Sequence, residues 1–132
     1  MTATVLDRHQ TQRDDIRNRL LRCDVLPICF QDEWICLENI HHIRPDFALL
    51  RTDSYARTFR FVNIAKAIRS DFPILVLSEK NDVEGFIQKN WLANLRFLRY
   101  PAKDQEFQGA IGLLSDGKRT QHPQTLVAAS AE

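Results

Sequence analysis

Four polar side chains stand where predicted β-strands end, and their types could form a small charged site. Asp7 follows the stretch 2–6, while Arg51, Ser78 and Tyr100 each close a later apolar stretch. In an open α/β sheet, ligands and reacting groups gather at the carboxyl ends of the strands. Arg51 with Ser78 could hold a small anion, and Arg51 could instead pair with the carboxylate of Asp7. Both alternatives require these strands to lie parallel in one sheet.

The apolar run Phe47–Leu50 is the strand around which the other elements are arranged. It contains no polar residue, as expected of a strand that helices cover on both faces of a parallel sheet. Pro45 disfavours helical geometry at the residue before it, so a preceding helix ends there. The strand therefore places Arg51 at its carboxyl end.

Four further stretches have the composition of β-strands. Thr2–Leu6 is rich in β-forming residues, and Ile74–Leu77 is the most hydrophobic run of this kind. Pro27 within Val25–Phe30 has no N–H to donate, which places that strand at a sheet edge. Leu95–Tyr100 alternates apolar and basic residues, as a strand at the opposite edge would. We expect a five-stranded parallel sheet in the order 2-1-3-4-5.

Helical patterns alternate with these strands and complete a doubly wound α/β domain with helices on both faces. Three helices are predicted over residues 8–22, 33–43 and 55–69, and a fourth begins at Asn81. The fifth has apolar residues at helical spacing up to Leu114. We assign residues 1–114 to the domain and 115–132 to a C-terminal tail or linker. The second helix is expected to face the sheet with Cys36, Ile40 and Ile43. The third is expected to face it with Phe59, Val62 and Ala65.

The overall charge and the cysteine spacing exclude several classes of function. A formal net charge of +1 gives no strong attraction to nucleic acid, and we expect no direct nucleic-acid binding by this domain. No apolar run approaches the ~20 residues that span a bilayer, so we expect a cytoplasmic protein without membrane contact. Cys23, Cys29 and Cys36 lack the paired spacing of zinc sites and are expected to be small buried side chains. We expect no metal and no cofactor.

Three local patterns, taken together, resemble the receiver (CheY-like) domains of two-component response regulators over roughly residues 2–114. The first is Pro45-Asp46 before a strand that ends at Arg51, and the second is the strand that ends at Ser78. The third is the stretch 97–101, in which Tyr100 stands where the family has lysine. Asp7 stands in the family's acidic pair, and Arg8 or Leu6 occupies the other acidic position. The resemblance implies the flavodoxin-like fold that the strand pattern also predicts.

The resemblance also implies what this chain lacks. In receivers, an aspartate at the position of Arg51 accepts a phosphoryl group, and carboxylates there hold Mg²⁺. A guanidinium stays protonated and cannot act as that nucleophile. We therefore expect a degenerate pseudo-receiver, in which Arg51 pairs with Asp7 unless both side chains are simply solvated. Tyr100 either joins the same pocket or points outward, and its bond to Pro101 could be cis.

Receivers present an output surface on the fourth helix, fifth strand and fifth helix. By resemblance, the candidate interface residues here are Trp91, Arg96, Phe97, Arg99 and Tyr100. Aromatic residues and arginine supply much of the binding energy at protein interfaces. The alternatives are ordinary packing for Trp91 and Phe97, and solvated edge positions for the two arginines.

The sequence favours a non-enzymatic regulatory module in signal transduction or transcription control. Such a module would dimerise or dock a protein partner, with an effector that is either fused or separate. The alternative is a small-ligand or anion sensor that uses the vacated pocket of Asp7, Arg51, Ser78 and Tyr100. An enzyme is not expected, because neither a glycine-rich phosphate loop nor a Gly-x-Ser-x-Gly elbow is present.

Overall fold

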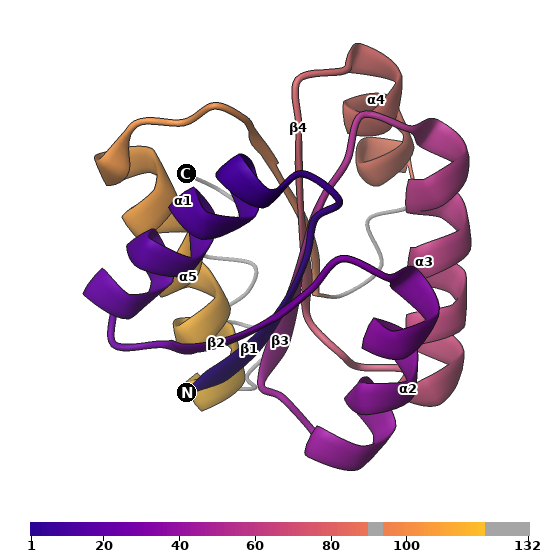
Figure 1. Ribbon diagram of the computed structural model, residues 1–132, viewed down its shortest axis with the longest axis horizontal. Coiled ribbons are helices and arrows are strands. Elements are labelled where there is room, and N and C mark those ends of the chain that lie inside the picture. Colours follow the sequence, from indigo (N-terminus) through magenta and orange to yellow (C-terminus); the bar gives the residue numbers. More distant parts are fainter. Residues whose placement is uncertain (90–93, 121–132) are drawn as a thin grey trace.

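A five-stranded parallel sheet lies between two layers of helices in the computed structural model, which describes residues 1–89 and 94–120 (Figure 1). The sheet has the predicted order β2-β1-β3-β4-β5. Its strands are β1 (Thr2–Leu6), β2 (Leu26–Phe30), β3 (Phe47–Arg51), β4 (Ile74–Ser78) and β5 (Leu95–Arg99). The helices are α1 (Gln10–Arg22), α2 (Glu33–Ile43), α3 (Tyr55–Ile68), α4 (Asn81–Lys89) and α5 (Asp104–Thr120). The predicted doubly wound fold is confirmed.

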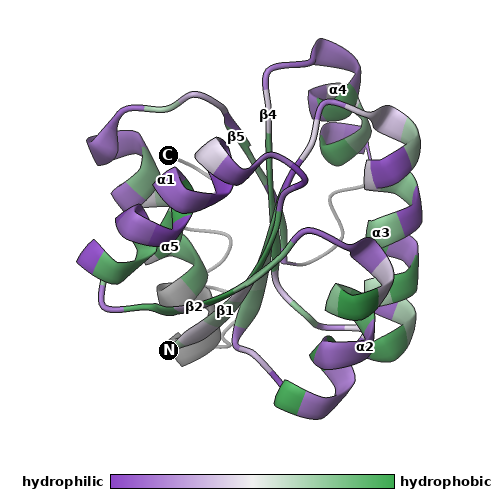
Figure 2. Cartoon of the chain, in the orientation of Figure 1, coloured by the Kyte–Doolittle hydropathy of each residue, from purple (hydrophilic) through white to green (hydrophobic). Residues whose placement is uncertain are grey.

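The two faces of the sheet carry separate hydrophobic cores. Figure 1 shows α1 and α5 on one face and α2, α3 and α4 on the other. Side chains alternate along each strand, so Phe47 and Leu49 of β3 join the core under α1 and α5. Ala48 and Leu50 join the core under the other three helices. In Figure 2 the central strands are accordingly mostly hydrophobic, while the helices carry polar residues on their outer sides.

Local sequence signals define several element ends. Pro27 lies on the edge strand β2, as predicted, where it is paired with Ala3 of β1. Ser54 caps α3 by accepting a hydrogen bond from the N–H of Arg57 at 3.2 Å. Asn94 has a φ of 76°, which lies in the left-handed region that asparagine adopts at helix ends. Of these residues, Ser54 lies at the carboxyl edge of the sheet, in the loop between β3 and α3.

Two details of the prediction need correction. Phe59 of α3 is 42% exposed because Phe61 takes the buried position, and Ile43 at the end of α2 is 38% exposed. Helix α5 continues to Thr120, past Leu114, where the predicted domain ends. Glycines within α5 do not end it, since a lone glycine weakens a helix by only ~1 kcal/mol relative to alanine. Residues 121–132 of the predicted tail lie outside the described residues.

Within the part of the chain that the structure describes, no helix combines the length and the apolar character needed to cross a bilayer. The longest helix, α5, includes acidic residues in its first turn. The helices instead have one apolar side, which packs on the sheet.

Candidate functional site

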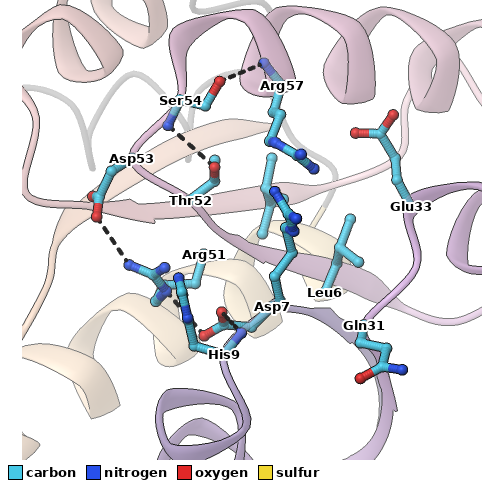
Figure 3. A pocket seen from close by; sticks show the side chains of 12 residues that line it. Leu6, Asp7, His9, Gln31, Glu33, Arg51, Thr52, Asp53, Ser54 and Arg57 are labelled. Atoms are coloured by element: carbon cyan, nitrogen blue, oxygen red, sulfur yellow. Dashed lines mark hydrogen bonds and ion pairs between the residues drawn. The ribbon is translucent and has the colours of Figure 1, made fainter.

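The strand register brings the predicted charged residues together at the carboxyl edge of the sheet. Leu6 of β1 is paired with Leu50 of β3, so Asp7 and Arg51 follow at the same level on neighbouring strands. Adjacent strands lie about 4.8 Å apart, which is within reach of an arginine side chain. Figure 3 shows the resulting site, in which the Arg51 guanidinium lies close to the Asp7 carboxylate.

Arg51 and Asp7 form a buried ion pair, as the sequence predicts. Nε of Arg51 donates to Oδ2 of Asp7 at 2.9 Å, and the two side chains are 7% and 0% exposed. The other carboxylate oxygen of Asp7 accepts the backbone N–H of His9, also at 2.9 Å. Both oxygens of Asp7 are therefore engaged within the chain. The alternative of two solvated side chains is excluded.

Asp53 belongs to the same network, although the sequence analysis did not single it out. Its Oδ2 accepts a hydrogen bond from Nη1 of Arg51 at 3.3 Å. Its Oδ1 accepts the hydroxyl of Ser78 at 3.0 Å and the N–H of Glu79 at 3.2 Å. Asp53 follows Arg51 by two residues, and this spacing is the only sequence signal that could have revealed it.

The two carboxylates respond to their surroundings in opposite directions. Burial raises the pKa of Asp7 above its ordinary value of 3.8, and the N–H of His9 and the charge of Arg51 offset this only partly. Burial acts on Asp53 as well, but hydrogen bonds from Glu79, Ser78 and Arg51 outweigh it and lower the pKa of Asp53. Asp53 is therefore the more firmly ionised of the two carboxylates.

Tyr100 does not join this site. Its hydroxyl donates to Oδ2 of Asp15 on α1 at 2.7 Å, and its ring is buried in the core under α1 and α5. Burial and the hydrogen bond to Asp15 raise the pKa of the Tyr100 hydroxyl. The bond between Tyr100 and Pro101 is cis. The predicted grouping of Tyr100 with Asp7, Arg51 and Ser78 therefore needs correction, because its hydroxyl hydrogen-bonds to Asp15 on α1, and the Asp7 carboxylate acts on it only through its charge.

The residues present do not fit the Mg²⁺ ion that receivers use. Magnesium prefers carboxylate and water oxygens at a near-octahedral site. Here both oxygens of Asp7 already accept hydrogen bonds, and the guanidinium of Arg51 lies beside them. A second cation at this position would be repelled by Arg51.

The cysteines are all free thiols. Burial raises the pKa of the Cys36 thiol to about 12, and it also raises the pKa values of Cys23 and Cys29. Such thiols are poor nucleophiles at neutral pH. Among the side chains that the structure describes, those of residues 1–89 and 94–114, no three His, Cys, Asp or Glu are grouped as metal ligands would be.

Of the predicted interface residues, Arg96, Phe97 and Arg99 lie on β5 beside α4. Arg96 and Phe97 line a shallow groove with Leu95 and residues of α4. Arg99 is engaged internally, since it donates to the carbonyl oxygen of Glu79 at 2.7 Å and to side chains of α4. Trp91 lies outside the described residues.

Comparison with known proteins gives a fold but no sequence family. No family model matches the sequence, and no curated protein matches it. Solved structures do match over most of the chain. A response regulator receiver domain from Clostridium thermocellum superposes with a TM-score of 0.78 at 16% identity, covering 92% of this chain and 98% of that one.

Two further structures have the same architecture. One is a response regulator receiver modulated diguanylate cyclase from Pelobacter carbinolicus, with a TM-score of 0.70, 19% identity and coverage of 89% and 94% of the two chains. The other is the chemotaxis response regulator CheY4 of Vibrio cholerae, with a TM-score of 0.72, 15% identity and coverage of 86% and 97%. The chain therefore has the fold of CheY-like receiver domains.

Proposed function

We propose that this chain is a receiver-like regulatory module that works without phosphorylation at the position of Arg51. It acts by binding a protein partner or a second copy of itself through the face formed by α4, β5 and α5. The module is not an enzyme and works in the cytoplasm, in signal transduction or transcription control, with a fused or separate effector. The observation that carries the proposal is the buried pair of Arg51 and Asp7 at the sheet edge.

This pair supports phosphorylation independence in two ways. A guanidinium cannot attack a phosphodonor, because it has no free electron pair while it is protonated. Ser78, which resembles the phosphate-contacting hydroxyl of receivers, is bonded to Asp53. A receiver fold whose charged edge is closed in this way is suited to a fixed conformation rather than to a phosphorylation switch.

The groove on β5 and α4 supports the choice of interface. It is lined by Arg96 and Phe97 together with Ile87 and Leu95, and therefore combines an apolar floor with a charged rim. Interfaces commonly have this composition. Arg99 is less suited to contact a partner, because its bonds to Glu79, Asn81 and Glu84 already hold β5 against α4.

Light scattering across a concentration series tests the self-association part of the proposal. We expect the wild-type chain to have the mass of a dimer and Arg96→Glu to shift it to monomer. Arg17→Glu on α1 is the matched control, because it changes the charge equally on an exposed helix outside this face. A wild-type dimer that survives Arg96→Glu would contradict the proposed face. A monomer at every concentration would restrict the proposal to a heterologous partner.

Phosphorylation independence has its own test. The wild-type chain is incubated with acetyl phosphate and Mg²⁺, and its intact mass is measured. We expect no added phosphoryl group and an unchanged solution mass. Stoichiometric phosphorylation together with a change in oligomeric state would contradict this part of the proposal.

The charged residues at the carboxyl edge of the sheet also bear on ligand sensing, the second candidate function. Arg51 and Ser78 are the predicted anion contacts. Arg51 already donates a hydrogen bond to the carboxylate of Asp7, and Ser78 donates one to that of Asp53. The position that a receiver would use is therefore filled. Ligand sensing is favoured instead by a neighbouring cavity, which other arginines line.

A further inference from the structure

A cavity of about 220 Å³ lies beside the pair of Arg51 and Asp7, between the loops that follow β1 and β3 (Figure 3). A wider polar groove of about 470 Å³ shares part of its lining and extends along the start of α2. The shared lining residues are Arg8, Gln31, Glu33 and Arg57. Volumes of about 300–1,000 Å³ are typical of small-molecule sites, so the two hollows together are large enough for a ligand.

The carboxylates that line the inner cavity are all neutralised within the chain. Asp7 and Asp53 share the guanidinium of Arg51. Glu33 forms an ion pair with Arg60 of α3. Each negative charge at the cavity wall therefore already has a positive partner.

Arg8 and Arg57 differ from Arg51 and Arg60 in this respect. Among the side chains of residues 1–89 and 94–114, neither guanidinium has an ion-pair partner or a side-chain hydrogen bond. Both line the inner cavity and the outer groove. In Figure 3 the side chain of Arg57 extends from α3 into the pocket. Two unpaired guanidinium groups at one opening are suited to a planar or tetrahedral oxyanion.

Neighbouring groups add neutral donors and an aromatic surface. The buried Thr52 hydroxyl accepts the N–H of Ser54 at 3.1 Å, which leaves its own hydrogen to donate. Helix α3 begins at the same wall, and its dipole favours negative charge there. Trp34 lines the outer groove and is 60% exposed, so its ring can take a flat group of a ligand by stacking.

We propose that this pocket binds a small phosphate ester, with the phosphate between Arg8 and Arg57 and a flat ring against Trp34. A nucleoside monophosphate has this chemistry. The inference deepens ligand sensing, the second candidate function, by naming the ligand class, and it is independent of the α4–β5–α5 groove, which lies at a different edge of the molecule. It also differs from the phosphorylation position of receivers, which Arg51 fills in this chain.

Titration of the full chain with AMP tests the proposal. Binding is measured by calorimetry and by amide shifts in nuclear magnetic resonance spectra. We expect saturable binding of AMP, with the largest shifts at Thr52, Ser54 and Arg57. Arg8→Gln and Arg57→Gln should each weaken binding about tenfold or more, because each removes a charge-assisted hydrogen bond. Arg17→Gln is the matched control on α1 and should leave the affinity unchanged.

Two further probes separate the phosphate from the ring. Inorganic phosphate should shift the same amides with lower affinity, whereas adenosine should not bind measurably. Trp34→Ala should weaken the binding of AMP about tenfold and leave phosphate binding unchanged, since it removes the aromatic surface on which the base stacks. Failure of AMP and phosphate to bind at millimolar concentration would overturn the proposal. Equal binding of AMP by wild type and by both arginine variants would also overturn it.

Discussion

Two neighbouring regions at the carboxyl edge of the sheet use the same kinds of residue to different ends. In the inner region, Arg51 lies between Asp7 and Asp53, and every group has a partner within the chain. In the outer region, Arg8 and Arg57 line an open cavity, and none of the side chains that the structure describes pairs with their guanidinium groups. The contrast indicates that residue type alone does not make a binding site. Charges that pair internally stabilise the fold, whereas charges left unpaired at a cavity are free to bind a ligand.

Burial explains why Arg51 and Asp7 need each other as partners. A buried ion pair is costly to break, because the remaining charge has lost its water without keeping a partner. Arg8 is exposed and Arg57 is only half-buried, so water solvates both guanidinium groups when no ligand is present. Four predictions follow from this difference between the two regions.

Removal of Arg51 should have the largest effect on stability. In Arg51→Ala, the carboxylate of Asp7 stays buried without its cation, and we expect the free energy of unfolding to fall by about 3–5 kcal/mol. Urea unfolding of the wild-type and variant chains measures this difference. An unchanged midpoint would show that the pair does not hold the strand ends together.

Replacement of both partners should cost much less than removal of one. In the double variant Asp7→Leu with Arg51→Met, no charge is left unpaired, and apolar side chains of similar volume fill the space. We expect the stability to recover to within about 2 kcal/mol of wild type. Urea unfolding of the two single variants and the double variant completes the cycle. A double variant as unstable as the sum of the single variants would contradict this account.

Asp53 should contribute a smaller and pH-dependent share. Its pKa is lowered in the folded chain, so its contribution is present above the ordinary value of 3.8 and is lost as pH falls through the folded value. Asp53→Asn should reduce stability by about 1 kcal/mol at neutral pH and flatten the decline on the acid side. Unfolding measured across the acid range tests this, and parallel profiles for wild type and variant would argue against it.

The outer arginines should contribute least to folding. Arg8→Gln and Arg57→Gln should each change the free energy of unfolding by no more than about 0.5 kcal/mol, because neither breaks a pair within the described residues. Thermal unfolding without added ligand provides the measurement. A loss as large as that of Arg51→Ala would place these residues in the structural network and remove the contrast between the regions.

The sequence was sufficient for the fold and for the centre of the inner site. Apolar runs such as Phe47–Leu50 and Ile74–Leu77 identify strands because only strands buried on both faces tolerate so few polar residues. Pro27 identified the edge strand by its missing donor. With the strand order known, Asp7 and Arg51 had to be neighbours, so their pairing could be predicted from strand ends alone.

The tertiary structure decided which other groups those residues contact. Tyr100 donates a hydrogen bond to Asp15, and Ser78 donates one to Asp53. In both cases the acceptor comes from a helix or loop far away in sequence. Strand periodicity gives the face on which a side chain lies, but not the rotamer or the partner that fixes it. The sequence by itself therefore determined the scaffold and its main ion pair. Only the packed structure separated the arginines that stabilise the edge from those that line its cavity.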